Sequence, residues 1–292
     1  MTKLREKRNG GRKATRPIVV LYHANCVDGF TAAYAAWKKF GAAAEYIPVQ
    51  HQTPPPDGLA GKEIYTVDFT YKAPIMQKLM KENRRVTSID HHVSSQKVTE
   101  STYKPLYALN HSGAVLAWNY FHPKKKTPFL SRYVEDMDLW KFKLPHTKEI
   151  IAYLDLFDFD FATWDQLMRE FENPSKRKKM IRDGGLVLRH EDRLVARLAA
   201  NNAEYVRLAG RTMLSVNSPL FHSEVGAALL KKLPPMALIW SRKNGMITVS
   251  LRSNGSVDVS KIAARFGGGG HKAAAGFAFP VTKKFPWKTL KK

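Results

Sequence analysis

The first hundred residues alternate between short apolar stretches and segments with the composition of helices. Four continuous or β-branched runs predict strands, at residues 18–22, 45–49, 63–68 and 86–89. Segments 31–37 and 75–82, between these runs, are rich in strong helix formers. Strands that alternate with helices of this length indicate βαβ units and a parallel sheet. We therefore predict an α/β fold with an N-terminal parallel sheet.

The pattern changes in the second half of the chain. Residues 149–171 have apolar positions at helical spacing, with a turn before Trp164, and residues 184–210 predict one long helix that bridges two domains. A strand is expected over residues 213–221. Residues 236–253 predict a hairpin whose turn is Lys243-Asn244-Gly245. This half therefore predicts a connector followed by a smaller α/β domain.

Asp and His side chains follow several of the predicted strands. They are His23 and Asp28 after the first strand, Asp68 at the end of the third, and Asp90, His91 and His92 at the end of the fourth; Asp136 and Asp138 lie further along the chain. In open α/β sheets, ligands bind beyond the carboxyl ends of the strands. Carboxylates and imidazoles without clustered thiolates suit Mn²⁺ or Mg²⁺, with zinc or iron as alternatives. Two such ions roughly 3.5–4 Å apart can activate water and hold a phosphoryl oxygen.

The length and composition limit the class of protein. A chain of 292 residues exceeds the usual size of a single core, which favours two domains. Cys26 is the only cysteine, which excludes an intramolecular disulfide and a cysteine-based zinc cluster. No apolar run approaches the ~20 residues that span a bilayer, and the basic N-terminus lacks the features of a secretory signal. We expect a cytoplasmic protein without a membrane partner.

The net charge points to a polyanionic partner. The chain has 48 Lys and Arg against 25 Asp and Glu, a formal net charge of +23. Such a field attracts nucleic acid, polyphosphate or anionic lipid, although it can also serve solubility alone. Basic residues concentrate in residues 1–16, which predict a disordered arm, and in 124–126 and 176–179, which are expected as solvated loops.

The strand-end motifs and one C-terminal motif together resemble a known family. The stretch NGSVDVSKIAARFGGGGHKAAAGF at residues 254–277, with Ser250-Leu251-Arg252-Ser253 just before it, is similar to the DHHA1 signature. The four strand-end segments resemble, in order, the motifs of DHH-family phosphoesterases of the DHH/DHHA1 type. That group includes RecJ-like exonucleases and nanoRNA/pAp phosphatases. The resemblance covers roughly residues 17 to 280.

The resemblance implies two α/β domains with the substrate in the cleft between them. The implied boundaries are a disordered basic arm at 1–16, a metal-binding DHH domain at 17–145, a helical connector at 146–210, a DHHA1 domain at 211–282 and a basic tail at 283–292. The first domain would carry the metal site. The second would bind the substrate phosphate.

The resemblance also implies roles for individual residues. The metal ligands would be His23, Asp28, Asp68, His91 and Asp138. Asp90 would be a ligand or would orient a ligand, and His92 would contact the scissile phosphate. The phosphate-binding residues are expected to be Arg252, Ser253, Gly268, Gly269, Gly270 and His271, because glycines let backbone N–H groups approach an anion and Arg and His add charge-assisted bonds.

The first motif departs from the family pattern. Where the family has a His followed by two aspartates at alternating positions, this chain has His23-x-Asn25-Cys26-x-Asp28, so one carboxylate is missing. Asn25 can coordinate through its carbonyl oxygen, and Cys26 can offer a thiolate or be a small buried hydrophobe. Asp136 also competes with Asp138 for the fourth motif. The following Leu139-Trp140 favours Asp138.

These observations together predict a metal-dependent phosphohydrolase. It would cleave phosphodiester or phosphomonoester bonds in short oligonucleotides or nucleotides, with two Mn²⁺ ions, or Mg²⁺ as the alternative. One alternative is an exopolyphosphatase-like enzyme, and another is a nucleic-acid-binding protein with a weakened metal site. A homodimer is compatible with the sequence.

Overall fold

The computed structural model describes residues 17–50 and 53–290, so the predicted basic arm at 1–16 lies outside the described residues. The N-terminal domain is built on a five-stranded, all-parallel sheet with the order β2-β1-β3-β4-β5. Its strands are β1 (Ile18–His23), β2 (Ala44–Val49), β3 (Glu63–Val67), β4 (Arg85–Asp90) and β5 (Leu106–Tyr107). The predicted parallel sheet is confirmed.

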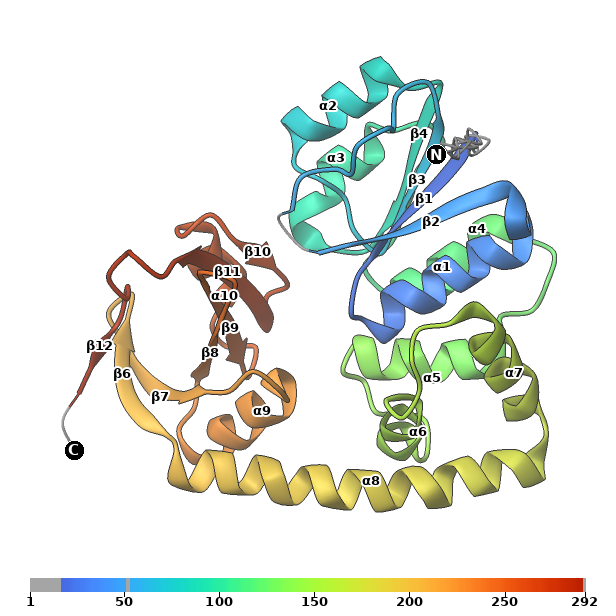
Figure 1. Ribbon diagram of the computed structural model, residues 1–292. Helices are drawn as coiled ribbons and strands as arrows, with labels where there is room; N and C mark the ends of the chain where they lie inside the picture. Colours follow the sequence, from blue (N-terminus) through green and yellow to red (C-terminus); the bar gives the residue numbers. More distant parts are fainter. Residues whose placement is uncertain (1–16, 51–52, 291–292) are drawn as a thin grey trace, which may run out of the picture.

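Helices cover both faces of this sheet (Figure 1). One face packs against α1 (Val27–Phe40) and α4 (Gly113–Phe121), and the other against α2 (Ala73–Glu82) and α3 (Gln96–Glu100). Because both faces are covered, the inner strand β1 is apolar over residues 18–22, with Val19, Val20 and Leu21 at most 1% exposed. The apolar runs of the sequence are therefore continuous rather than alternating.

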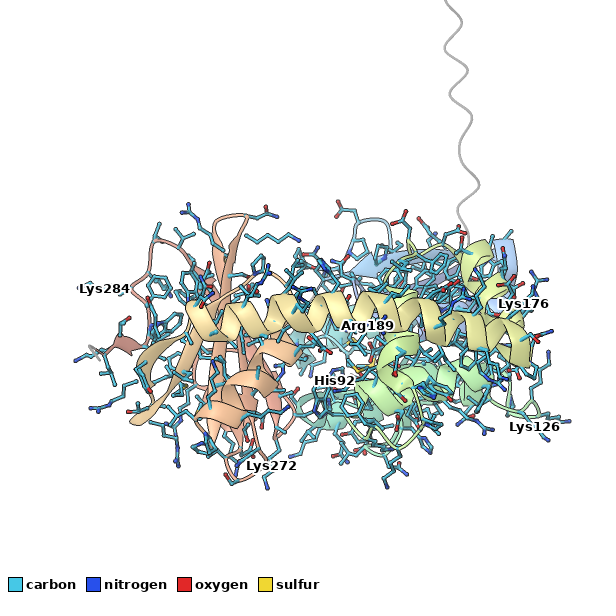
Figure 2. The ribbon with its side chains drawn as sticks, turned by 90° about the horizontal axis from the view of Figure 1, so that it is seen from below. His92, Lys126, Lys176, Arg189, Lys272 and Lys284 are labelled. Carbon is cyan, nitrogen blue, oxygen red and sulfur yellow. The ribbon has the colours of Figure 1, made fainter. Side chains whose placement is uncertain are left out.

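Helical segments lead from the first domain to the second. They are α5 (Phe129–Asp138), α6 (Thr147–Leu154), α7 (Phe161–Glu172) and the long α8 (Pro174–Asn201). Helix α8 runs along one side of the whole molecule and joins the two domains, as Figures 1 and 2 show from two directions. Within residues 17–50 and 53–290, no helix has both the length and the apolar character needed to cross a membrane.

The bounds of α8 correct the sequence-based expectation at both ends. The helix begins at Pro174, where the side chain of Asn173 accepts hydrogen bonds from the backbone N–H groups of Ser175 and Lys176. The basic residues 176–179 therefore lie in the first turns of a helix and not in a loop. At its other end the helix stops at Asn201, because residues 204–208 pair as a strand.

The C-terminal domain contains a seven-stranded mixed sheet with the order β10-β11-β9-β8-β7-β6-β12. Its strands are β6 (Glu204–Leu208), β7 (Arg211–Asn217), β8 (Met236–Lys243), β9 (Met246–Ser253), β10 (Gly269–Gly270), β11 (Ala274–Pro280) and β12 (Lys288–Thr289), with helices α9 (His222–Lys232) and α10 (Val259–Ala264). The predicted hairpin is present as β8 and β9, and Asn244 and Gly245 both have positive φ, as its tight turn requires. The sheet begins before the expected boundary at residue 211 and extends into the expected tail.

Candidate metal centre and phosphate-binding cleft

The carboxyl ends of β1, β3 and β4 deliver the predicted polar side chains to one edge of the first sheet. These strands are neighbours in the sheet, so His23, Asp68 and the Asp90-His91-His92 segment come together. Asp68 has φ of 61°, in the left-handed region that non-glycine residues seldom adopt. Backbone strain of this kind concentrates at functional sites, and here it turns the Asp68 side chain into the cluster.

Asp68 is the centre of this cluster. It is 1% exposed, and its two carboxylate oxygens reach two different imidazoles: Oδ2 lies 3.3 Å from Nδ1 of His23, and Oδ1 lies 3.2 Å from Nε2 of His91. Burial alone would raise the pKa of Asp68, but the hydrogen bonds with the two histidines outweigh it and hold this pKa well below its usual range. One carboxylate thus bridges two groups of potential ligands.

The second group of ligands surrounds His91. Its Nε2 atom lies 3.6 Å from Oδ2 of Asp138 and 3.9 Å from Oδ2 of Asp28. Asp28 is fixed by the backbone N–H groups of Gly113 and Ala114 at the start of α4, at 2.7 and 3.0 Å from its oxygens. A Cβ atom on Gly113 would lie 2.5 Å from Cβ of Asp68. Only glycine therefore allows α4 to begin so close to the cluster.

The first group of ligands contains Cys26 rather than a second aspartate. Potential ligand atoms of His23, Cys26 and Asp68 all lie within 4.8 Å of one another. Burial raises the pKa of the Cys26 thiol, and a hydrogen bond with His23 partly offsets this effect. Asn25, in contrast, is exposed and has φ of 56°. Asparagine tolerates this left-handed conformation, so Asn25 serves the turn from β1 into α1.

This geometry favours a different alignment of the first motif, shifted by one position. Cys26 and Asp28, which are two residues apart, stand where the family pattern has its alternating aspartates. The thiol of Cys26 adds one soft donor to otherwise hard oxygen and imidazole ligands.

The two residues can be distinguished by substitution. We expect Cys26→Ser to weaken one of two metal-binding steps by roughly tenfold or more, because the hydroxyl stays protonated where a thiol can ionise. Cys26→Asp should restore tight Mn²⁺ binding, and Asn25→Ala should change neither step. Isothermal titration of metal-stripped protein with Mn²⁺ and with Cd²⁺ measures both steps. If Asn25→Ala weakens metal binding and Cys26→Ser does not, the ligand is Asn25 and not Cys26.

Asp90 and His92 form a separate pair at the rim of the cluster. Asp90 is fully buried, and its Oδ1 atom lies 2.7 Å from Nδ1 of His92, while its other oxygen accepts a hydrogen bond from Ser95. The backbone N–H groups of His91 and His92 also donate to Asp90 Oδ1. Burial lowers the pKa of His92, but the charge of Asp90 outweighs it and raises this pKa overall. Asp90 is thus occupied in orienting His92.

The C-terminal domain faces this cluster across a cleft of about 290 Å³. The imidazole of His271 stacks on that of His92, with ring centroids 5.0 Å apart and planes at 25°. Burial and the neighbouring histidines lower the pKa of His271 to about 4. Arg252 also lines the cleft and donates to Oγ of Ser223 at 3.0 Å. In Figure 2, His92 lies at the junction between the two domains, behind α8.

Glycines shape the same side of the cleft. Gly269 and Gly270 line it, and Gly270 has φ of 136° with an ideal Cβ position 2.6 Å from the carbonyl oxygen of Ala274. A side chain at Gly270 would therefore clash with the neighbouring strand. This wall combines exposed backbone, an arginine and a histidine, which is a set of groups suited to a phosphate.

The structure also removes three predicted residues from the cleft. Asp136 accepts hydrogen bonds from the backbone N–H groups of Lys143 and Leu144 and from the Thr147 hydroxyl, so it organises the loop after α5 and is not placed as a ligand. Ser253 donates to the carbonyl oxygen of Val257, on the face of β9 opposite to Arg252. An ideal Cβ on Gly268 would lie 2.0 Å from the carbonyl oxygen of Gly276, so this glycine is needed for packing.

Sequence-based reasoning missed three contributors. Ser95 fixes Asp90, Ser250 lines the cleft on the same face of β9 as Arg252, and Gly113 makes room for Asp68. The alternation of β9 could have identified Ser250, since residues two apart on a strand share a face. The role of Gly113 depends on a contact between distant parts of the chain, which no local pattern records.

The donors at the strand ends fit divalent metal ions. Two groups of three potential ligands lie side by side: His23, Cys26 and Asp68, and Asp28, His91 and Asp138. Nδ1 of His91 is buried without a hydrogen-bond partner among the described residues. Two buried carboxylates in one cluster, Asp28 and Asp68, require compensating positive charge. Together with the facing phosphate-binding wall, these features define a metal-dependent phosphoesterase.

Comparisons with known proteins identify the family. Residues 224–286 match the model of the DHHA1 domain. The chain is 30% identical over 290 residues to the uncharacterized protein R106 of Acanthamoeba polyphaga mimivirus, covering 91% of this chain and 68% of that protein. It is 27% identical over 175 residues to the oligoribonuclease NrnB of Bacillus subtilis, covering 56% and 42% of the two chains. The chain belongs to the DHH/DHHA1 family of phosphoesterases, which are metal-dependent hydrolases.

Among solved structures, the chain is similar to the pGpG-specific phosphodiesterase PggH of Vibrio cholerae. It is 13% identical, with a TM-score of 0.47, and the match covers 91% of this chain and 94% of that one.

Proposed function

We propose that this protein hydrolyses phosphodiester bonds in short oligoribonucleotides with the help of two Mn²⁺ ions. The observation that supports this proposal best is that the candidate metal ligands of one domain face the candidate phosphate-binding residues of the other. The metal-ligand cluster of the first domain and the phosphate-binding wall of the second approach within ring-contact distance at His92 and His271. A phosphate between them would contact groups from both domains at once.

The ions would be held by His23, Cys26 and Asp68 on one side, and by Asp28, His91 and Asp138 on the other, with Asp68 between the two groups. Bound ions of this kind supply an activated water and positive charge beside the phosphoryl oxygens. Mn²⁺ suits a set of oxygen and imidazole ligands and, better than Mg²⁺, tolerates the softer sulfur of Cys26.

The other residues would bind and orient the scissile phosphate. Arg252, positioned by Ser223, can donate two N–H groups to one phosphate, and the backbone of Gly269 and Gly270 adds donors. Nδ1 of His92 is hydrogen-bonded to Asp90. Its Nε2 atom would therefore be available to donate a hydrogen bond to a phosphoryl oxygen. Because Asp90 raises the pKa of His92, the protonated ring is available to stabilise negative charge that develops during the reaction.

The proposed substrate class, short RNA, is supported by the net charge of the chain and by the name of one relative. The net charge of +23 favours a polyanion, and the relative from Bacillus subtilis carries the name oligoribonuclease. The matched part spans 42% of that relative, so its activity comes to this chain as a proposal. Inorganic polyphosphate also fits the charge and stays the second candidate. The expected cytoplasmic location and homodimer remain predictions.

A substrate panel tests this proposal. Purified protein with added Mn²⁺ would be given short RNA, pAp, a cyclic dinucleotide and polyphosphate, and products would be quantified by mass spectrometry. We expect a specificity constant for short RNA at least about tenfold above the others, equivalent to about 1.4 kcal/mol of transition-state binding. Faster phosphate release from polyphosphate would establish the second candidate. The same panel with Asp68→Asn shows which activity belongs to this site.

A further inference from the structure

A second cavity of about 530 Å³ lies at the base of the cleft, where α8 joins the two domains. Its walls come from the loop after α5, from α6 and α8, and from α9, which all lie in the lower part of Figure 1. The apolar part includes Trp140, Phe142 and Leu220. The polar part includes Asp155, Glu191 and Glu224. Its volume is in the range of small-molecule sites, about 300–1,000 Å³.

This cavity adjoins the catalytic cleft on both of its walls. On the first domain, Met137 and Trp140 line the cavity and flank the proposed ligand Asp138 in the chain. On the second domain, Ser223 lines the cavity and accepts a hydrogen bond from Arg252, which lines the cleft. His222 and Ser250 are paired across the same boundary, at 3.1 Å. A ligand with its phosphate in the cleft could therefore extend into the cavity.

An exposed aromatic side chain projects from a strained loop at the mouth of this cavity. Trp140 is 45% exposed and meets only the edge of Phe142 among aromatic neighbours, with ring centroids 4.8 Å apart. Trp140, Phe142 and His146 all have positive φ, and Asp136 anchors the loop through two backbone N–H groups. Non-glycine residues held in this conformation within one loop indicate a functional constraint. Trp140 is thus fixed by the fold and open on one face.

The polar wall of the cavity contains three carboxylates as well as the amines of Lys148 and Lys231. Among the described residues, the carboxylates of Asp155, Glu191 and Glu224 have no ion pair or hydrogen bond, although they converge from α6, α8 and α9. Burial and the neighbouring charges of Asp155 and Glu224 raise the pKa of Glu191 to about 7. Above that pH, the ionised Glu191 carboxylate only accepts hydrogen bonds. A ligand that presents N–H groups would therefore satisfy these carboxylates.

We propose that this cavity is a nucleobase subsite, in which Trp140 stacks on a base of the substrate and Glu191 accepts hydrogen bonds from its Watson–Crick edge. The proposal rests on the proposed function, because it places the scissile phosphate in the adjoining cleft. Single-stranded bases are generally bound in this way, by stacking on aromatic side chains and by hydrogen bonds to their edges. Guanine fits best, since its edge offers N1–H and N2–H side by side, whereas adenine and uracil interleave donors with acceptors.

Two variants test the subsite. We expect Trp140→Ala to lower kcat/KM for RNA dinucleotides by roughly tenfold more than for a dinucleotide analogue without bases, as the loss of one stacked base predicts. Glu191→Gln should abolish the preference for diguanylate over diadenylate, because the amide replaces one acceptor by a donor. Tyr205→Ala and Glu82→Gln, at exposed positions on β6 and α2, are the matched controls. Equal losses on substrates with and without bases would overturn the subsite, and a guanine preference kept in Glu191→Gln would overturn the role of that carboxylate.

A binding measurement separates this inference from the proposed function. Guanosine, which has no phosphate, should bind metal-stripped wild-type protein in calorimetry and should bind Trp140→Ala at least about fivefold more weakly. Binding with this dependence would support the subsite even if the protein hydrolysed no RNA, in which case only the proposed function fails. Hydrolysis of RNA with no measurable guanosine binding, or with binding unaffected by Trp140→Ala, would overturn the subsite alone.

Discussion

Replacing Asp68 by asparagine is expected to lower kcat/KM for a short RNA by about a thousandfold or more, equivalent to about 4 kcal/mol. The reason is its bridging position: its two oxygens contact His23 and His91, which belong to the two ligand groups. An amide keeps the shape but loses the negative charge that holds two dications close together. Asparagine also tolerates the φ of 61° at this position, so the backbone should not change.

The controls for Asp68→Asn concern metal content and folding. Metal analysis should show less than the wild-type amount of bound Mn²⁺, and the thermal unfolding of the metal-stripped protein should stay close to that of the wild type. The same substitution at Asp158, an exposed residue between α6 and α7, should leave activity unchanged. Activity of Asp68→Asn within about threefold of the wild type is incompatible with a bridging ligand, since such ligands contribute orders of magnitude.

The second large effect is expected at the Asp90–His92 pair. His92→Gln should reduce kcat by roughly a hundredfold, in the range lost when one group that stabilises the transition-state charge is removed. Bound Mn²⁺ should not change, because His92 stands outside both proposed ligand groups. Asp90→Asn should have a similar effect, because it removes the negative charge that raises the pKa of His92.

The double variant distinguishes a cooperating pair from two independent residues. If Asp90 acts through His92, the Asp90→Asn/His92→Gln variant should be no slower than His92→Gln, since groups that act as a unit are not additive. His190→Gln, at an exposed position on α8, is the matched control. Additive losses, or loss of Mn²⁺ on substitution of His92, would show that the two residues act separately or that His92 is itself a ligand.

The sequence predicted the first sheet and the convergence of most candidate metal ligands, because both depend on local patterns. Buried parallel strands are continuous apolar runs, and such sheets place their sites at the carboxyl ends of strands. The strand pattern alone therefore assigns His23, Asp68 and His91 to one edge of the sheet. The family resemblance added Asp28 and Asp138, which local rules alone do not distinguish from other acids.

The features that could not be predicted depend on contacts between distant segments. In the sequence, Asp136 competed with Asp138 for the fourth motif, although the following Leu139-Trp140 favoured Asp138. In the structure, the oxygens of Asp136 accept hydrogen bonds from Lys143, Leu144 and Thr147. The segment 204–208 continued a helical pattern, yet it pairs with β7 because a sheet edge is available there. Tertiary pairing of this kind overrides local propensity.

The position of Cys26 in the cluster, where Asn25 was one of the expected ligands, has a similar origin. From the sequence alone, an amide seemed the closest substitute for a missing carboxylate. The structure shows instead that the turn after β1 requires a left-handed residue at position 25, which directs the next side chain, Cys26, toward His23 and Asp68. The conformation of the turn, and not the chemical similarity of the side chains, decides which residue enters the cluster.

The most direct test of the two-metal centre is the initial rate of RNA dinucleotide cleavage by metal-stripped wild-type protein as Mn²⁺ is added. The two ligand groups predict a rate near background without metal and a rise in two steps, because the group that contains Cys26 has fewer carboxylates than the group around His91. Cleavage that persists in the stripped protein, or that no concentration of Mn²⁺ restores, would contradict the assignment of this strand-end cluster as the catalytic centre.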